Sequence, residues 1–74
     1  MRQNGPAIRS IRELNGYSQD ALAKATGMTQ ANLSMIENER ASAQVTTLSK
    51  IARQLRVPLA AVMRELDETA GSAA

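Results

Sequence analysis

The sequence contains no cysteine and no histidine among its 74 residues. Without cysteine there is no disulfide framework, and without both residue types the usual zinc ligand sets are missing. Catalytic schemes that use a thiolate or an imidazole are excluded for the same reason. Because Ser18 and Ser34 then lack a base to activate them, we expect neither an enzyme nor a bound cofactor.

Aromatic residues and long apolar runs are also scarce. Tyr17 is the only aromatic residue, the apolar runs are a few residues long, and no secretory signal opens the chain. A membrane span requires about 20 apolar residues. We therefore expect one small cytoplasmic domain that does not enter a membrane. At this length folding buries about 60% of the unfolded surface, so the core is thin.

The net charge of +2 is small, but the charges are unevenly placed. Residues 1–64 hold all nine basic residues and four of the seven acidic ones, a net charge of +5. A compact basic body suits a polyanionic partner such as DNA. An ordinary solvated surface can carry the same charges, so composition alone leaves both interpretations open.

Alanine and leucine are plentiful, and apolar residues recur every three or four positions, which predicts an all-helical fold. Ser18 and Thr29 suit helix N-caps, and Gly16 and Gly27 suit helix ends. We expect five helices, at about 7–15, 18–26, 30–38, 45–55 and 58–66. They form one domain over residues 1–67, with residues 68–74 as a disordered tail. The positions expected to face inward on the first and fourth helices are Ile8, Ile11, Leu14, Val45, Leu48, Ile51, Ala52 and Leu55.

The second and third helices are separated by only Gly27, Met28 and Thr29. Ala23 leaves room for the third helix to approach closely, and Gly27 takes a positive φ without steric cost. Such a corner holds the third helix clear of the domain, so that it can enter a major groove.

The outward residues of the third helix include no acid. Gln30 and Asn32 have the amide side chains that pair with adenine, and Ala31 or Met35 could contact a thymine methyl group. The polar face of an ordinary amphipathic helix has similar residues, so each position taken singly fits both interpretations.

Three stretches carry a resemblance: Gln-Asp-Ala-Leu-Ala at 19–23, Gly-Met-Thr-Gln at 27–30 and Leu-Ser-Met-Ile-Glu-Asn at 33–38. Together they resemble the helix-turn-helix of the XRE family, which includes Cro and the lambdoid phage repressors. The likeness continues through 47–52 and 55–59 and covers about residues 7 to 64. It implies a compact five-helix, lambda-repressor-like domain that regulates transcription, most simply a repressor on a palindromic operator.

The resemblance also implies roles for individual residues. The positions that match base-reading positions are Gln30, Ala31, Ser34 and Met35. Those expected near the DNA backbone are Gln19, Asn32, Asn38 and Arg40, and Gln19 would also brace Gln30. Arg12 and Glu37 match a pair that forms a salt bridge in relatives, which favours a structural role for Glu37 over a direct one.

Three features depart from the family pattern. Glu39 stands where relatives usually have glycine, and the family's loop proline is missing from residues 41–44. Arg56 also replaces a frequent glycine, and a left-handed residue other than glycine costs about 1 kcal/mol. Glu39 would bring a negative charge close to the expected phosphate path.

The resemblance favours a homodimer that places two recognition helices about 34 Å apart. On the fifth helix Leu59, Val62, Met63 and Leu66 have the spacing of one stripe. Met63 and Leu66 are the expected dimer patch, although a core stripe with a frayed end would show the same pattern. Residues 1–4 are either a DNA-contacting arm or disordered.

Two other functions remain open. An antitoxin that represses its own operon and binds a toxin as protein partner can share this fold, but no long toxin-wrapping tail follows Leu66. A protein-interaction module that has lost DNA binding is a further alternative. The absence of acids on the outward face of the third helix counts against it.

Overall fold

Helix starts in this chain are set by side chains that accept otherwise free backbone amides. The structure is a computed structural model, and it describes residues 2–64. Asn4 accepts from the amide of Ala7 at 3.1 Å, and Ser18 and Thr29 cap the next two helices in the same way. Such a cap is worth about 1 kcal/mol. Three helices therefore begin where a local capping residue places them.

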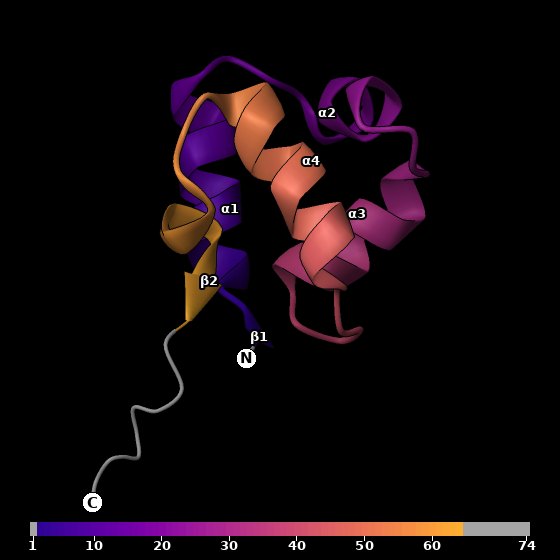
Figure 1. Ribbon diagram of the computed structural model, residues 1–74. Coiled ribbons are helices and arrows are strands. Elements are labelled where there is room, and N and C mark those ends of the chain that lie inside the picture. The colour runs from indigo at the N-terminus through magenta and orange to yellow at the C-terminus, as the bar shows by residue number, and fades with distance from the viewer. Residues whose placement is uncertain (1, 65–74) are drawn as a thin grey trace, which may run out of the picture.

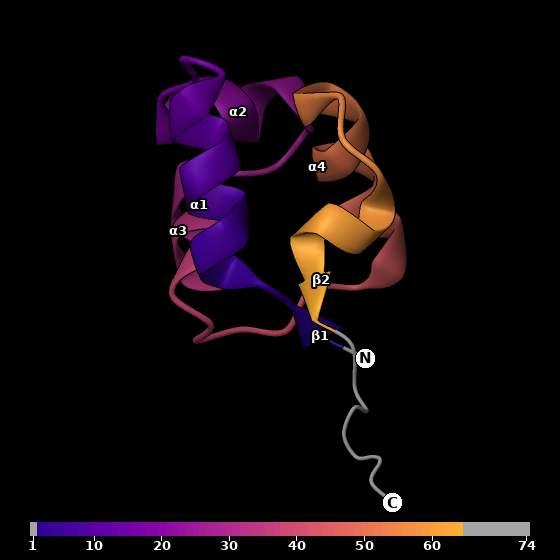
Figure 2. The same cartoon turned by 90° about the vertical axis from the view of Figure 1, so that its left-hand side faces the viewer.

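Four α-helices and one short 3₁₀ turn make up most of the described chain (Figure 1). The elements are β1 (Arg2–Gln3), α1 (Gly5–Leu14), α2 (Gln19–Ala25), α3 (Gln30–Glu37), α4 (Val45–Leu55), the 3₁₀ turn η1 (Leu59–Val62) and β2 (Met63–Arg64). α2 packs against α3, α3 packs against α1, and η1 packs against both α1 and α4 (Figure 2). The predicted all-α fold is confirmed, with helix boundaries for α2, α3 and α4 within one residue of expectation.

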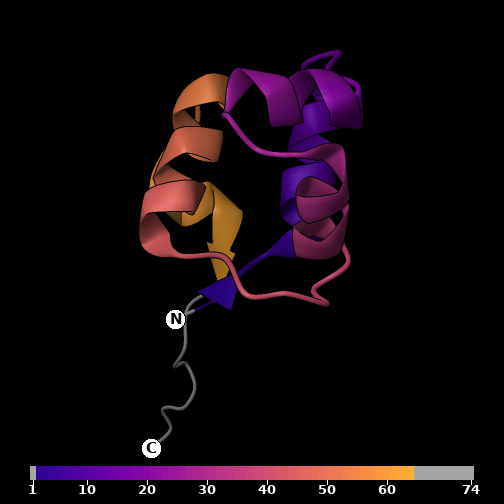
Figure 3. The same ribbon diagram turned by 90° about the vertical axis from the view of Figure 1, so that its right-hand side faces the viewer.

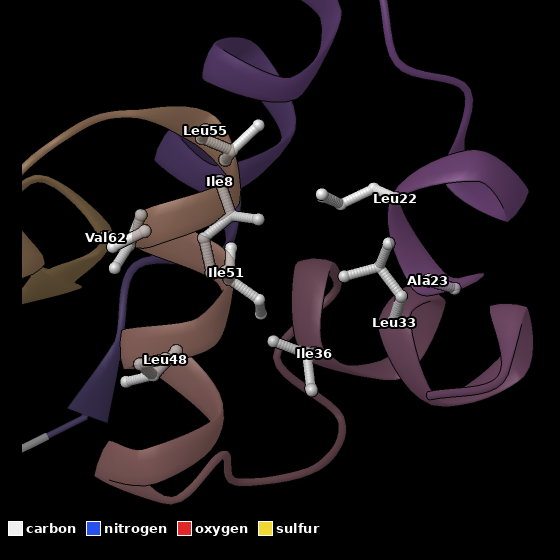
Figure 4. Packing of buried hydrophobic residues seen from close by; sticks show 10 residues of the cluster. Ile8, Leu22, Ala23, Leu33, Ile36, Leu48, Ile51, Leu55 and Val62 are labelled. Carbon is white, nitrogen blue, oxygen red and sulfur yellow. The ribbon is translucent and has the colours of Figure 1, made fainter. Parts of the chain in front are cut away.

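One hydrophobic core lies between these elements (Figure 4). Every α-helix and η1 contribute to it, and its buried residues are Ile8, Leu22, Ala23, Leu33, Ile36, Leu48, Ile51, Ala52, Leu55 and Val62. Fully burying one such aliphatic side chain is worth about 1.5–3 kcal/mol. Because the core is small, the orientation of α3 depends on a few side chains.

Two residues expected to face inward are on the surface. Leu14 is 85% exposed, because the buried face of α1 runs from Ile8 to Arg12 and the helix ends at Leu14 itself. Val45 is 46% exposed, since it is the first residue of α4 and precedes the turn that packs on the core. The prediction was wrong at these two helix ends.

The fifth helix expected over 58–66 is replaced by η1 and then by β2. At Met63 the backbone is extended, with φ −125° and ψ 151°. The carbonyl of Val62 accepts from the amide of Asn4 at 2.9 Å, and Met63–Arg64 pair antiparallel with Arg2–Gln3. The backbone N–H and C=O groups that a longer helix would have bonded internally are therefore used for pairing with the N-terminal segment.

This pairing corrects two further expectations. Residues 2–3 are neither disordered nor a free arm, because they form β1. Met63 is not on a helical stripe but on a strand, where it is partly buried against the core. Leu66 and the expected tail at 68–74 lie outside the described residues.

α1 begins two residues earlier than expected and meets the end of α3 at Gly5. Gly5 is buried, and a Cβ there would overlap the carbonyl group of Glu37. A side chain at this position would therefore push the two helices apart. Arg56 ends α4 in the left-handed conformation expected of it, with φ 61°. Within residues 2–64, none of the helices combines the length and apolar character that crossing a membrane requires.

Candidate nucleic-acid interface

The turn between α2 and α3 holds the two helices close together. Ala23 is fully buried and its carbonyl accepts from the amide of Met28 at 2.9 Å. Gly27 has φ 75°, the left-handed conformation expected at the end of α2. Leu22 and Leu33 are buried at the contact. These contacts fix α3 against α2 by one face and leave its other face free.

The free face of α3 carries the residues expected to meet DNA. Gln30, Ala31 and Asn32 are exposed, Met35 is 43% exposed, and Ser34 is partly buried. Asn38 ends the helix by donating from Nδ2 to the Ser34 carbonyl at 2.9 Å. The face is short, uncharged and rich in amide groups, and these groups can donate to and accept from base edges.

Gln19 at the start of α2 links the exposed face to the interior. Its Nε2 donates to Oε1 of Glu37 at 3.1 Å, and its Oε1 accepts from Nε2 of Gln30 at 3.5 Å. The second bond is long and exposed, so it orients Gln30 weakly. The arrangement brings Gln19 and Gln30 together, which the bracing role requires.

Arg12 and Glu37 form the ion pair implied by the family resemblance. Arg12 Nε donates to Oε2 of Glu37 at 2.7 Å and its Nη2 donates to Oε1 at 3.2 Å. Both side chains are nearly buried, at 9% and 2% exposure. Arg12 also donates to the Tyr17 carbonyl at 2.9 Å. The Glu37 carboxylate is thus satisfied inside the domain, where it ties α1 to α3.

Glu39 follows α3 in the left-handed conformation, with φ 58°, which is the geometry that glycine usually supplies. Its Oε2 accepts from Arg64 at 2.6 Å and from the amide of Gly5 at 2.9 Å, and its Oε1 accepts from Arg2 at 3.4 Å. The hydrogen bond from Arg64, and then that from Gly5, lower the pKa of Glu39 below its ordinary value. The acidic side chain is directed at the start of α1 and is paired there.

The loop after α3 passes beside β1 (Figure 3), and the side chain of Gln3 attaches the two. Its buried side chain donates to the carbonyls of Ala41 at 2.6 Å and Ile36 at 3.3 Å, and accepts from the amide of Ala43 at 3.3 Å. Arg40 is exposed in this loop, and its amide donates to the Met35 carbonyl at 2.8 Å. The loop that presents Arg40 is therefore fixed at both ends.

Sequence reasoning missed the contribution of Gln3, Arg2 and Arg64 to this region. Glu39 itself is a signal, because an acid at a position where relatives have glycine, next to the expected phosphate path, needs a basic partner elsewhere. Nothing in the sequence identifies Arg64, which is 25 residues away, as that partner.

Comparison with known proteins agrees with this geometry. A helix-turn-helix family model matches residues 8–62. The HTH-type transcriptional regulator SutR of Escherichia coli K12 is 43% identical over 69% of this chain and 29% of its own length. Antitoxin HipB of the same strain is 36% identical over 72% of this chain and 60% of its own length. The chain thus spans less than two thirds of these curated relatives.

The fold is also that of a protein solved on DNA. SinR of Bacillus subtilis, a master regulator of biofilm formation solved in complex with DNA, matches with a TM-score of 0.71 and 30% identity. The match covers 74% of this chain and 89% of that one. With a family model spanning most of the domain and this shared fold, the chain belongs to the helix-turn-helix family of the XRE type, that of Cro and the lambda repressor.

Proposed function

We propose that this chain is a sequence-specific DNA-binding transcription regulator, most simply a repressor, that places α3 in the major groove of its operator. The observation that carries the proposal is the free, uncharged face of α3. The opposite side of this helix is held in place by α2 and by the Arg12–Glu37 pair. The family match and the likeness to SinR, solved in complex with DNA, support it. A regulator of this kind acts in the cytoplasm and needs no cofactor.

Within this proposal the residues that contact DNA divide into two groups. Gln30, Ala31, Ser34 and Met35 read base edges, since they lie along the free face of α3. The residues that meet the sugar-phosphate backbone are Gln19, Asn32, Asn38 and Arg40. Contacts of the first group specify the sequence, and contacts of the second group fix the register of the protein on the duplex.

The regulator is proposed to bind as a homodimer on a palindromic operator. Two copies related by a two-fold axis would place their recognition helices about 34 Å apart, one turn of DNA. The dimer contact is proposed for the segment that includes Met63 and Leu66. Met63 would contribute to this contact from β2 and not from a helical stripe.

The decisive experiment is a titration of duplexes from the region upstream of the chain's own gene against random duplex at two salt concentrations. The proposal expects tight binding to one palindromic segment, two protomers per duplex and a steep salt dependence. Equal affinity for upstream and random duplexes would contradict sequence-specific regulation.

The identity to HipB favours a second candidate, a DNA-binding antitoxin that represses its own operon. This candidate predicts a toxin gene beside the gene of this chain and a stable complex of the two products. Co-expression of the adjacent product followed by size-exclusion chromatography distinguishes the two candidates. Separate elution with intact operator binding would favour the simple repressor.

A further inference from the structure

Two arginines face each other across the small sheet that joins the ends of the described chain. Arg2 and Arg64 are direct cross-strand partners in the β1–β2 register. Like charges in this position repel each other. Glu39 lies between them and accepts one hydrogen bond from each. The carboxylate neutralises one of the two charges and holds both guanidinium groups in place.

Arg40 adds a third guanidinium beside this pair. A shallow groove is lined by Arg2, Gln3, Glu39, Arg40, Ala41 and Ser42. Counting Arg64, this region has three cations and one anion. In contrast, the exposed Lys24–Asp20 pair on α2 matches one cation with one anion. Positive charge is therefore in excess around this groove, whose lining includes the buried Gln3.

The groove also has unused hydrogen-bond donors. Arg2 and Arg64 each donate to Glu39 through a terminal nitrogen, and their side chains remain 57% and 42% exposed. A guanidinium has five N–H donors, so most of them stay available. Over residues 2–64, the backbone amides of Ala41 and Ser42 donate to no protein acceptor. Free amides beside guanidinium groups are the donors that phosphate oxygens prefer.

We propose that the β1–β2 sheet and the loop at residues 39–42 form a second DNA-backbone site, in which Arg2 and Arg64 bind phosphate together with Arg40. The inference rests on the proposed function and extends it beyond the helix-turn-helix. The groove lies directly after α3, where a helix seated in the major groove has a phosphate strand beside its end. Glu39 is a positioning residue here, because it directs the two arginines and contacts no DNA.

The test compares salt dependence for three variants. Arg2→Gln with Arg64→Gln removes both sheet cations. Arg2→Lys with Arg64→Lys keeps the charges. Arg9→Gln is the matched control, since Arg9 is also an exposed arginine in a single ion pair, on α1. Kd is measured on the operator and on random duplex over a series of salt concentrations, with Tm measured in parallel.

The proposal expects the double glutamine variant to lower the slope of log K against log salt by about two per bound protomer, or about four for a dimer, at roughly 0.9 per phosphate contact. Operator and random duplex should lose affinity by the same factor. The double lysine variant should recover most of the slope, and the Arg9 variant should leave it unchanged. A purely structural role of the arginines would lower Tm and operator preference without changing the slope on random duplex.

A further variant, Arg40→Gln, is measured in the same way. The inference is overturned if the double glutamine variant keeps the wild-type slope while Arg40→Gln reduces it. The proposed function would then stand, with phosphate contacts confined to the helix-turn-helix and its loop. If the wild-type chain binds operator and random duplex equally, the proposed function fails instead. In that case the slope of the double glutamine variant on random duplex still shows whether Arg2 and Arg64 bind phosphate.

Discussion

The side-chain amide of Gln3 donates a 2.6 Å hydrogen bond to the carbonyl oxygen of Ala41, across 38 residues of sequence. It is the shortest of the three bonds by which this buried glutamine holds the loop after α3. The second residue of β1 therefore holds in place the loop that follows α3 and presents Arg40, an expected contact of the DNA backbone.

Replacing Gln3 by alanine should lower the free energy of unfolding by about 1–3 kcal/mol, because the partner groups on Ala41 and Ala43 lose their bonds in a mostly buried place. Urea denaturation measures the change. Gln44→Ala is the control, since Gln44 is exposed and makes no capping bond, and it should stay within about 0.5 kcal/mol of wild type. Equal effects would mean that the loop does not depend on Gln3.

Gly5→Ala should be destabilising by about 1–3 kcal/mol, because its Cβ would overlap the carbonyl of Glu37 and force α1 and α3 apart. Gly16→Ala is the comparison. A Cβ at Gly16 meets open space, so only its φ of 77° opposes the change, at about 1 kcal/mol. Thermal unfolding should rank Gly5→Ala as the more harmful, and the reverse order would refute the close approach of the two helices.

Arg12→Met should cost about 3–5 kcal/mol, because it leaves the buried carboxylate of Glu37 without its main partner. Glu37→Met should be similarly harmful. The double variant, with both charges removed, should be more stable than either single variant. Guanidinium denaturation of all four proteins gives the coupling, and additive losses would show that the two residues do not act as a pair.

The lowered pKa of Glu39 predicts a pH-dependent stability. In the unfolded chain this carboxyl titrates near its ordinary value of 4.5, and in the folded chain it titrates lower, chiefly because Arg64 donates to it. The contribution to stability is therefore present above pH 4.5 and is lost as the pH falls through the folded value. Tm measured from pH 6 to pH 3 should fall less steeply for Glu39→Gln than for wild type. Parallel curves would count against the Arg64 contact.

Gln30→Ala should weaken operator binding by about 1–3 kcal/mol and relax the preference at one base pair. Arg40→Ala should instead weaken binding to all duplexes and lower the salt slope by about one per bound protomer. Competition assays with operators changed at single positions separate these patterns. If Gln30→Ala loses equally on operator and random DNA, Gln30 is not a base reader.

The four α-helices could be predicted because their signals are local. Ser18 and Thr29 lie at the helix starts that they cap, and Gly27 takes the positive φ that its position requires. The pair of Arg12 and Glu37 was available only through the family resemblance, because 25 residues of sequence separate them.

The sheet and its contacts could not be predicted. Two-residue strands have no periodicity to detect, and Met63 continued the apolar spacing of a helix. The pairing of residues 2–3 with residues 63–64 is decided by tertiary contacts at both ends of the described chain. The role of Glu39 depends on the same contacts, since its partners Gly5 and Arg64 come from α1 and β2.

The closure of β1 by β2 has a consequence for synthesis on the ribosome. α2, α3 and Arg40 emerge before Arg64, which is 25 residues behind Glu39. A nascent chain stopped before Met63 would have a helix-turn-helix, but its N-terminal segment would lack a strand partner and Glu39 would lack its strongest donor. The β1–β2 pairing and the hydrogen bond from Arg64 to Glu39 therefore form late in translation, after the last described residues have left the exit tunnel.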